Sequence, residues 1–184
     1  LHGWAKAGAP RGTGPDPMTT VSPAAAGGWE LGPPDLILTI PTQSIPATGE
    51  IDYLYSTVNL PFAEERWVRA AVVQPGNRRV VHHALVFEGT IFDVLAASAG
   101  QGGYFAGFVP GVAQTAFPAG TGKRVRGGSA LTFQIHYTPT GRPETDATRI
   151  GLYFSAAPPV LELQTRTAYA PLFPVNTISI PPRV

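Results

Sequence analysis

The sequence contains no cysteine, only one methionine and almost no net charge. The absence of cysteine excludes disulfides, thiolate metal ligands, c-type haem attachment and a cysteine nucleophile. A net charge of +1, from 13 basic and 12 acidic residues, argues against a nucleic-acid partner. No apolar run reaches the roughly 18 residues that a membrane-spanning helix requires. The lack of cysteine does not fix the compartment, because a domain of this size can be secreted without disulfides.

Glycine and proline are abundant instead, with 21 and 20 copies among 184 residues. So many helix breakers argue against a helix bundle and favour short strands joined by turns. Nine phenylalanines, six tyrosines and three tryptophans argue against a disordered chain, because they supply a core. The length suits one domain with an attached segment.

The composition divides the chain into three parts. Residues 1–34 are rich in Gly, Pro, Ala, Thr and Ser, which predicts an extension or linker. We expect Trp29 and Leu31 to dock this linker onto the domain. Residues 35–170 form the expected domain, and 171–184 form a C-terminal extension. A short helix over the first seven residues is expected to stop at the following Gly-Ala-Pro.

The expected domain consists of short β runs separated by Gly/Pro turns. The runs with strand character are 36–40, 51–59, 67–74, 80–88, 130–137, 148–155, 160–167 and 176–180. Outside a short helical pattern at 91–99, no long helical period is present. This pattern predicts an all-β fold, an antiparallel β-sandwich. The Gly-rich and aromatic segment 100–122 is expected to be a structured loop over one end of the sheets.

Histidine is the residue type that carries the most information about chemistry. His82 and His83 are adjacent inside one expected strand, His136 lies near the end of another, and His2 sits in the leading segment. In the 130–137 run, four apolar residues share one face, so the alternation places His136 on the opposite, polar face.

Adjacent residues of a regular strand point to opposite faces, so His82 and His83 should not both reach one ion. They would converge if the strand were bulged, or if both rings bound through the nitrogen nearer the backbone. Three imidazoles without a carboxylate or thiolate would suit copper or zinc. On spacing alone, the simpler interpretation is one core histidine with two surface histidines.

Other polar groups indicate less. Lys123, Arg124 and Arg126 form a small basic group that we interpret as a solvated turn. Glu144 and Asp146 fall in a hairpin where a general acid would be hard to desolvate. The only methionine lies in the linker, too far from the histidines to serve as a ligand unless the linker folds back.

Three motifs occur in the order found in one enzyme family. They are Val81-His82-His83-Ala84-Leu85-Val86-Phe87, Phe117-Pro118-Ala119-Gly120-Thr121-Gly122 and Leu131-Thr132-Phe133-Gln134-Ile135-His136-Tyr137. The stretch 51–154 that contains them resembles the N-terminal copper domain of the copper type II, ascorbate-dependent monooxygenases. Peptidylglycine alpha-hydroxylating monooxygenase and dopamine beta-monooxygenase belong to this family.

The resemblance implies a sandwich of jelly-roll type in which His82, His83 and His136 bind copper. In this family that copper stores an electron and passes it to a second copper, where oxygen is activated to hydroxylate a C–H bond. Ascorbate supplies the electrons. The resemblance also implies an exported protein, periplasmic or extracellular.

The sequence departs from the family in ways that limit the expected activity. The family's second copper domain has a His-x-His pair and a methionine ligand, and the sequence has no such pair and no methionine after the copper strands. This chain is therefore not expected to hydroxylate a substrate alone. Residues 173–182 resemble the join into that second domain.

The first twelve residues resemble the end of the last helix of a c-type cytochrome domain. This resemblance implies an upstream cytochrome-like partner domain, although the sequence has no Cys-x-x-Cys-His and so does not support a haem within this chain. A short exposed helix is the plain alternative.

Two further functions are consistent with the sequence. The sandwich could be a non-catalytic subunit of a larger periplasmic redox or membrane-associated complex, because Pro-rich ends often drape over partners. It could also bind carbohydrate through aromatic residues between Tyr104 and Phe117, although such residues more commonly dock into a core.

Overall fold

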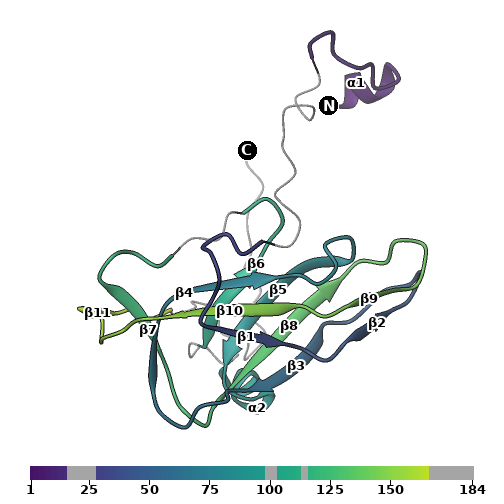
Figure 1. Cartoon of the computed structure of the whole chain (residues 1–184). Helices are drawn as coiled ribbons and strands as arrows, with labels where there is room; N and C mark the ends of the chain where they lie inside the picture. Colours follow the sequence, from purple (N-terminus) through teal and green to yellow (C-terminus); the bar gives the residue numbers. More distant parts are fainter. Residues whose placement is uncertain (16–27, 98–102, 113–115, 166–184) are drawn as a thin grey trace, which may run out of the picture.

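The computed structural model describes residues 1–15, 28–97, 103–112 and 116–165 (Figure 1). Two short helices and eleven strands lie in these ranges. The helices are α1 (His2–Lys6) and α2 (Ile91–Ala97). The strands are β1 (Leu36–Thr39), β2 (Gln43–Ile45), β3 (Leu54–Asn59), β4 (Arg66–Gln74), β5 (Val81–Glu88), β6 (Tyr104–Phe108), β7 (Thr121–Val125), β8 (Ala130–Tyr137), β9 (Glu144–Asp146), β10 (Arg149–Phe154) and β11 (Leu161–Glu162).

The strands form two main sheets. The five-stranded sheet has the order β1-β10-β4-β7-β11, and the four-stranded sheet has the order β3-β8-β5-β6. A small ladder of β2 and β9 accompanies them. All pairs are antiparallel except β7 with β11, which run parallel. The all-β, antiparallel prediction is confirmed.

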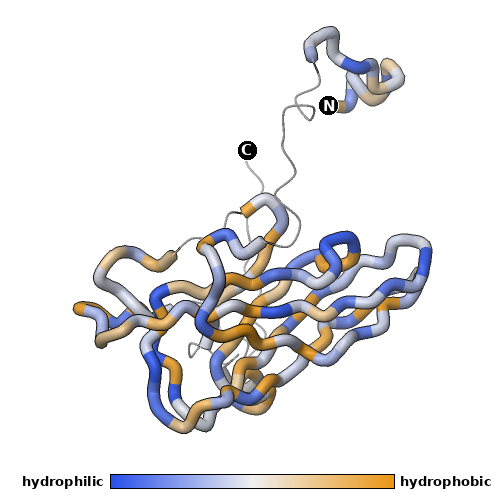
Figure 2. Tube along the Cα trace, viewed as in Figure 1, coloured by the Kyte–Doolittle hydropathy of each residue, from blue (hydrophilic) through white to orange (hydrophobic). Residues whose placement is uncertain are grey.

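The hydrophobic core lies between the two main sheets and draws buried residues from both. Strand β8 shows the alternation behind this arrangement, because Leu131, Phe133, Ile135 and Tyr137 are each at most 2% exposed. The residues between them point to the outer face of the sheet. In Figure 2 the hydrophobic stretches follow the strands, whereas several turns at their ends are hydrophilic. Burial of one face of each sheet therefore orients every side chain of the outer faces.

Most of the expected strands are present. Seven of the eight runs contain a strand, the short helix at 91–99 is α2, and the eighth run, 176–180, lies outside the described residues. The expectation of a loop over 100–122 is wrong in part, because β6 and the first residues of β7 lie there. The glycines of this segment argued against strands, because glycine has a low strand propensity. Gly107 nevertheless pairs with Leu85 in the ladder between β5 and β6.

The segment 28–34 covers part of the outer face of the five-stranded sheet, as expected for Trp29 and Leu31. Both pack against a small buried cluster of Ala70, Val72 and Tyr153. The Tyr153 hydroxyl donates a hydrogen bond to the Gly32 carbonyl at 2.7 Å. Glycine is required beneath the indole, because a Cβ at Gly151 would lie 2.8 Å from Cζ3 of Trp29. By contrast, α1 buries none of its residues.

Two of the polar residues interpreted as solvated are buried. Asp146 is 2% exposed and accepts hydrogen bonds from the Tyr137 hydroxyl, at 2.9 Å, and from the backbone and hydroxyl of Thr148. Burial, together with the Asp146 carboxylate, raises the pKa of Tyr137, so the phenol stays protonated as the donor. Asp146 is therefore a structural acceptor that ties the β9 hairpin to the core.

The second residue is Lys123, which lies in β7 and is 7% exposed, so the expectation of a solvated side chain is wrong for it. Its neighbours Arg124 and Arg126 are exposed. Among the described helices, none is long and apolar enough to cross a membrane.

Candidate metal centre

Two neighbouring strands in the middle of the four-stranded sheet carry the three histidines. His82 and His83 belong to β5, His136 belongs to β8, and His83 is directly opposite His136 in the antiparallel register. The register pairs Val81 with Tyr137 and then His83 with His136, so it skips His82. Strand β5 is thus bulged at His82, with two residues opposite one on β8.

The bulge places both adjacent histidines on the outer face. Val81 and Ala84, on either side of the pair, are 3% and 0% exposed and point into the core. A regular strand would turn one of the two histidines between them inward. The alternation of a regular strand, which would point His82 and His83 to opposite faces, therefore does not hold here, because the extra residue shifts it. The expectation that His136 lies on the polar face is confirmed.

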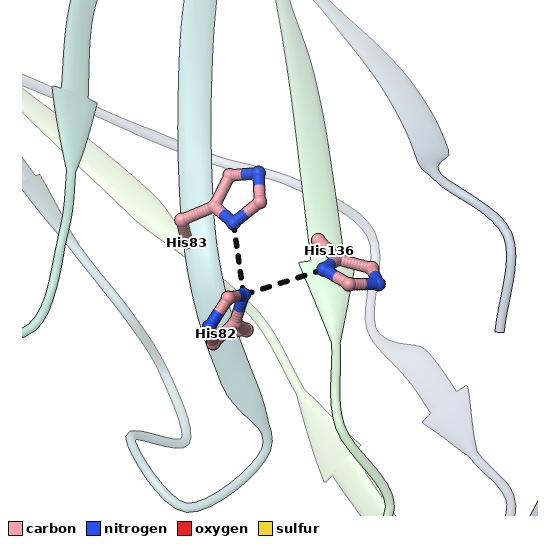
Figure 3. Close-up of side chains that lie close together, drawn as sticks. All are labelled: His82, His83 and His136. Atoms are coloured by element: carbon pink, nitrogen blue, oxygen red, sulfur yellow. Dashed lines mark hydrogen bonds between the residues drawn. The ribbon is translucent and has the colours of Figure 1, made fainter. Parts of the chain in front are cut away.

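The three imidazole rings point toward one another (Figure 3). Nδ1 of His82 lies 3.1 Å from Nδ1 of His83 and 3.3 Å from Nδ1 of His136. Ligand nitrogens of all three residues lie within 4.8 Å of one another. Both conditions for convergence are met together: the strand is bulged, and the nitrogens that meet are those nearer the backbone. We call this group the histidine trio.

The three Nδ1 atoms cannot all form good hydrogen bonds with one another, but their arrangement fits a metal ion. A ring nitrogen carries either one proton or one lone pair, so Nδ1 of His82 cannot pair well with both neighbours at once. A cation bound by the three nitrogens would satisfy all of them. A metal with bonds of about 2.0–2.1 Å sets tetrahedral ligands about 3.3 Å apart, close to the separations in the trio.

The aromatic side chain of Tyr53 contacts two rings of the trio. Tyr53 precedes β3, whose register with β8 pairs Tyr55 with Gln134 and, extended by two residues, brings Tyr53 opposite His136. The Tyr53 ring stacks on His136 with centroids 5.0 Å apart, and it lies 5.7 Å from the His83 ring. Tyr53 was not among the predicted site residues. The signal for it was its two-residue spacing from Tyr55, which places both on one strand face.

The environment keeps His83 neutral. Burial, followed by the neighbouring rings of His82 and His136, lowers the pKa of His83. His83 is therefore a neutral, metal-competent ligand at pH 7. No carboxylate joins the trio in the described ranges, where it is the only such group of three or more candidate ligands. A metal held here has three imidazole nitrogen donors, which suit copper and zinc.

The remaining candidate ligands do not reach the trio. His2 is exposed in α1 and belongs to no ligand group. Met18 lies outside the described residues. Three of the aromatic residues proposed for sugar stacking serve the core instead, since Phe105 and Phe108 are buried in it and Phe117 packs against it. Tyr104 is partly exposed.

Comparison with known proteins finds no family model and no curated protein that matches this chain.

Proposed function

We propose that this chain is a copper-binding, electron-transferring domain of an exported protein similar to the ascorbate-dependent monooxygenases. The observation that carries the proposal is the convergence of three Nδ1 atoms on the outer face of the sheet. The order of the three sequence motifs supports the choice of copper over zinc. When bound, copper supplies a one-electron couple between its two common oxidation states.

The residues of the chain suit the transfer of an electron better than the chemistry of a substrate. Imidazole nitrogens bind copper, and both strands that hold them are central in a packed sheet, which keeps their positions fixed. His82 is exposed, so a donor or acceptor can approach the trio from solvent. Among the described residues, no carboxylate belongs to this group of candidate ligands.

The Tyr53 ring contributes by orientation. Stacking on His136 restricts the rotation of that imidazole and keeps its Nδ1 directed at the other two rings. Gln134, two residues before His136 on the same face, donates a hydrogen bond of 2.6 Å to the Tyr55 hydroxyl. This neighbouring pair anchors β3 to β8 beside the trio. Tyr53 is thus a positioning residue in the proposal.

The proposal also includes the setting in which the domain works. In the family it resembles, hydroxylation requires a second copper domain, so we propose that this chain delivers electrons and does not hydroxylate alone. A second copper domain, an upstream cytochrome-like domain or a larger redox assembly would be the partner. The jelly-roll topology and the periplasmic or extracellular location are parts of the same proposal.

The test begins with metal content. The purified chain, exposed to copper and to zinc and then desalted, should retain about one copper ion, measured by elemental analysis. His136→Ala should weaken copper binding at least about 100-fold. It removes a metal ligand itself, which costs more affinity than the loss of a residue that only orients a ligand. Gln134→Ala is the matched control on the same face of β8 and should keep the copper. Equal copper affinity in the His136→Ala and wild-type proteins would exclude His136 as a ligand.

Electron transfer is tested separately on the copper-loaded chain. Ascorbate should abolish the electron paramagnetic resonance signal of Cu(II), and reoxidation should restore it. A signal that persists in excess ascorbate would contradict the electron-transfer role. A chain that takes up neither copper nor zinc would favour the alternative of a non-catalytic subunit in a larger complex.

A further inference from the structure

A buried lysine outside the trio is a second feature of the structure. Lys123 lies on β7, 7% exposed, on the same inward face as the core residue Val125. The chain has only one other lysine, Lys6, which is exposed in α1. A buried lysine normally pairs with a carboxylate, because the desolvated charge is costly. Lys123 forms no such ion pair among the described residues.

The Lys123 ammonium is held by oxygen acceptors and aromatic rings instead. Nζ lies 3.1 Å from the Tyr104 carbonyl oxygen, 2.7 Å from that of Phe105 and 3.0 Å from the Thr165 hydroxyl. The rings of Tyr104, Phe105 and Phe117 surround it, with centroids 5.4, 5.4 and 5.5 Å from Nζ. These contacts fix the amine between the edge strand β6 of one sheet and β7 of the other.

The hydroxyl makes the site able to hold the uncharged amine as well. The charged form donates to two carbonyls and to Thr165. The neutral form donates to the same two carbonyls, and its lone pair accepts from the Thr165 hydroxyl, because a hydroxyl can both donate and accept. Neither form leaves a hydrogen-bonding group unpaired. Burial lowers the pKa of Lys123 to about 8.

The other charged groups near Lys123 compensate one another. Arg124 pairs with Glu65 and Glu162, and Arg126 pairs with Glu88. Burial raises the pKa of Tyr104, so its phenol is neutral. The group that titrates nearest to neutral pH on this side of the molecule is therefore Lys123 itself.

Two clefts give small molecules access to this position. One has a volume of about 400 Å³ and the other about 210 Å³, and Lys123, Tyr104 and Thr165 line both. The lone pair of the neutral amine faces Thr165, which belongs to the cleft wall. A molecule that displaces the Thr165 hydroxyl thus meets the nucleophilic side of the amine.

We propose that Lys123 is a covalent attachment site for a small, uncharged carbonyl compound, such as an aldehyde, which it binds as an imine. The neutral amine attacks the carbonyl carbon to form a C–N bond, and a proton moves from nitrogen to oxygen. The hydroxyl then leaves as water with a proton taken up from solvent, and the C=N double bond of the protonated imine forms. The step consumes no oxidant or reductant. It is independent of the copper proposal, since it uses none of the same residues.

The surroundings favour a carbonyl compound over an acylating agent or carbon dioxide. A protonated imine keeps the positive charge that the three aromatic rings stabilise, and it keeps one N–H to donate to a backbone carbonyl. An amide removes the charge. A carbamate replaces the charge with a negative one beside two carbonyl oxygens, which repel it. Of the three products, the imine is therefore the one that adds no negative charge beside the carbonyl oxygens and can still be protonated among the rings.

The test compares Lys123 with Lys6 and with the N-terminal amine in the same chain. The folded protein is treated briefly at pH 7 with acetaldehyde and cyanoborohydride, which traps the imine as an ethyl group, and modified peptides are quantified by mass spectrometry. At pH 7 about a tenth of an amine of pKa 8 is neutral, against less than about a thousandth of an ordinary lysine. We expect Lys123 to react at least tenfold faster than Lys6, at a rate near that of the N-terminal amine.

Two variants and one condition complete the test. Lys6→Arg should keep the fast reaction in the intact-mass spectrum, and Lys123→Arg should lose it while retaining the buried charge. In urea, where the fold is lost, Lys6 and Lys123 should react at equal rates. A folded chain in which Lys123 reacts no faster than Lys6 would overturn the proposal.

Discussion

The outer faces of the two sheets differ in what covers them. On the five-stranded sheet, Trp29 and Leu31 pack over Ala70, Val72 and Tyr153. On the four-stranded sheet, Tyr53 and Tyr55 remain 46% and 41% exposed beside the histidine trio. The covered face pairs its polar groups with the covering segment, since the Tyr153 hydroxyl and the Gln74 amide donate to the backbone carbonyls of Gly32 and Gly28. The open face presents ring nitrogens that can bind a ligand. The outer face of the five-stranded sheet thus contributes packing, and the outer face of the four-stranded sheet carries the candidate metal ligands.

The largest effect that tests this division is expected on the covered face. Trp29→Ala should lower the free energy of unfolding by about 2 kcal/mol, because a half-buried indole loses its packing on Tyr153 and Gly151. Urea unfolding measures the change, and Trp29→Phe should recover part of it. Copper affinity should stay unchanged. A Trp29→Ala protein that loses copper while still folded would break the comparison, since the two faces would then be coupled.

A smaller effect, of opposite kind, is expected on the open face. Tyr53→Leu should weaken copper binding by about threefold to tenfold, the range expected for a lost aromatic stacking contact. The unfolding free energy should change little, because Tyr53 is exposed. Tyr55→Leu is the matched control, since Tyr55 contacts Gln134 and no ring of the trio. Isothermal titration with copper distinguishes the two variants, and equal affinities would remove Tyr53 from the site.

The smallest expected effect is a pH dependence of the stability of the metal-free protein, which arises from the open face only. The pKa of His83 is lowered in the fold by burial and by His82 and His136, whereas an unfolded histidine titrates near pH 6.5. Just below pH 6.5 the unfolded chain therefore binds more protons than the folded chain. The stability of the metal-free protein should fall as the pH drops through this window, and the contribution of His83 should be constant above about pH 7.

His83→Asn tests the origin of that slope. The variant should show a shallower loss of stability between pH 7 and pH 5, a window that lies above the ordinary titration of carboxylates. The covered face contributes no histidine, so Trp29→Ala should keep the wild-type slope. Identical slopes in the wild-type and His83→Asn proteins would contradict the assignment.

The sequence was sufficient for features that depend on local pattern. Alternation in β8 placed His136 on the outer face, and Gly/Pro turns separated the strands in the right places. The docking of Trp29 and Leu31 followed from two large apolar residues in an otherwise small-residue linker. Burial of one face of a strand requires apolar residues at every second position, and this alternation can be read from the sequence.

Features that depend on a partner strand could not be derived in this way. The bulge at His82 is defined by the register with β8, and two adjacent polar residues between Val81 and Ala84 do not by themselves show where the extra residue lies. The sequence predicts solvated side chains for Lys123 and Asp146, because charged side chains usually lie in solvent. Their acceptors and donors come from β6 and from Tyr137, 18 and 9 residues away. A polar group can be buried only where hydrogen-bond partners reach it, and the residues adjacent to it in the sequence do not indicate whether partners from elsewhere in the chain will do so.

The bulge at His82 also has a consequence for how the sheet is held together. An irregular position interrupts the backbone ladder between the two central strands, and an ion shared by β5 and β8 would act there as a cross-link. Copper loading should therefore slow amide hydrogen exchange around Val81–Ala84 more than in β10, which belongs to the other sheet. The interruption that brings the ligands together is also the place where the bound ion restores the connection between strands.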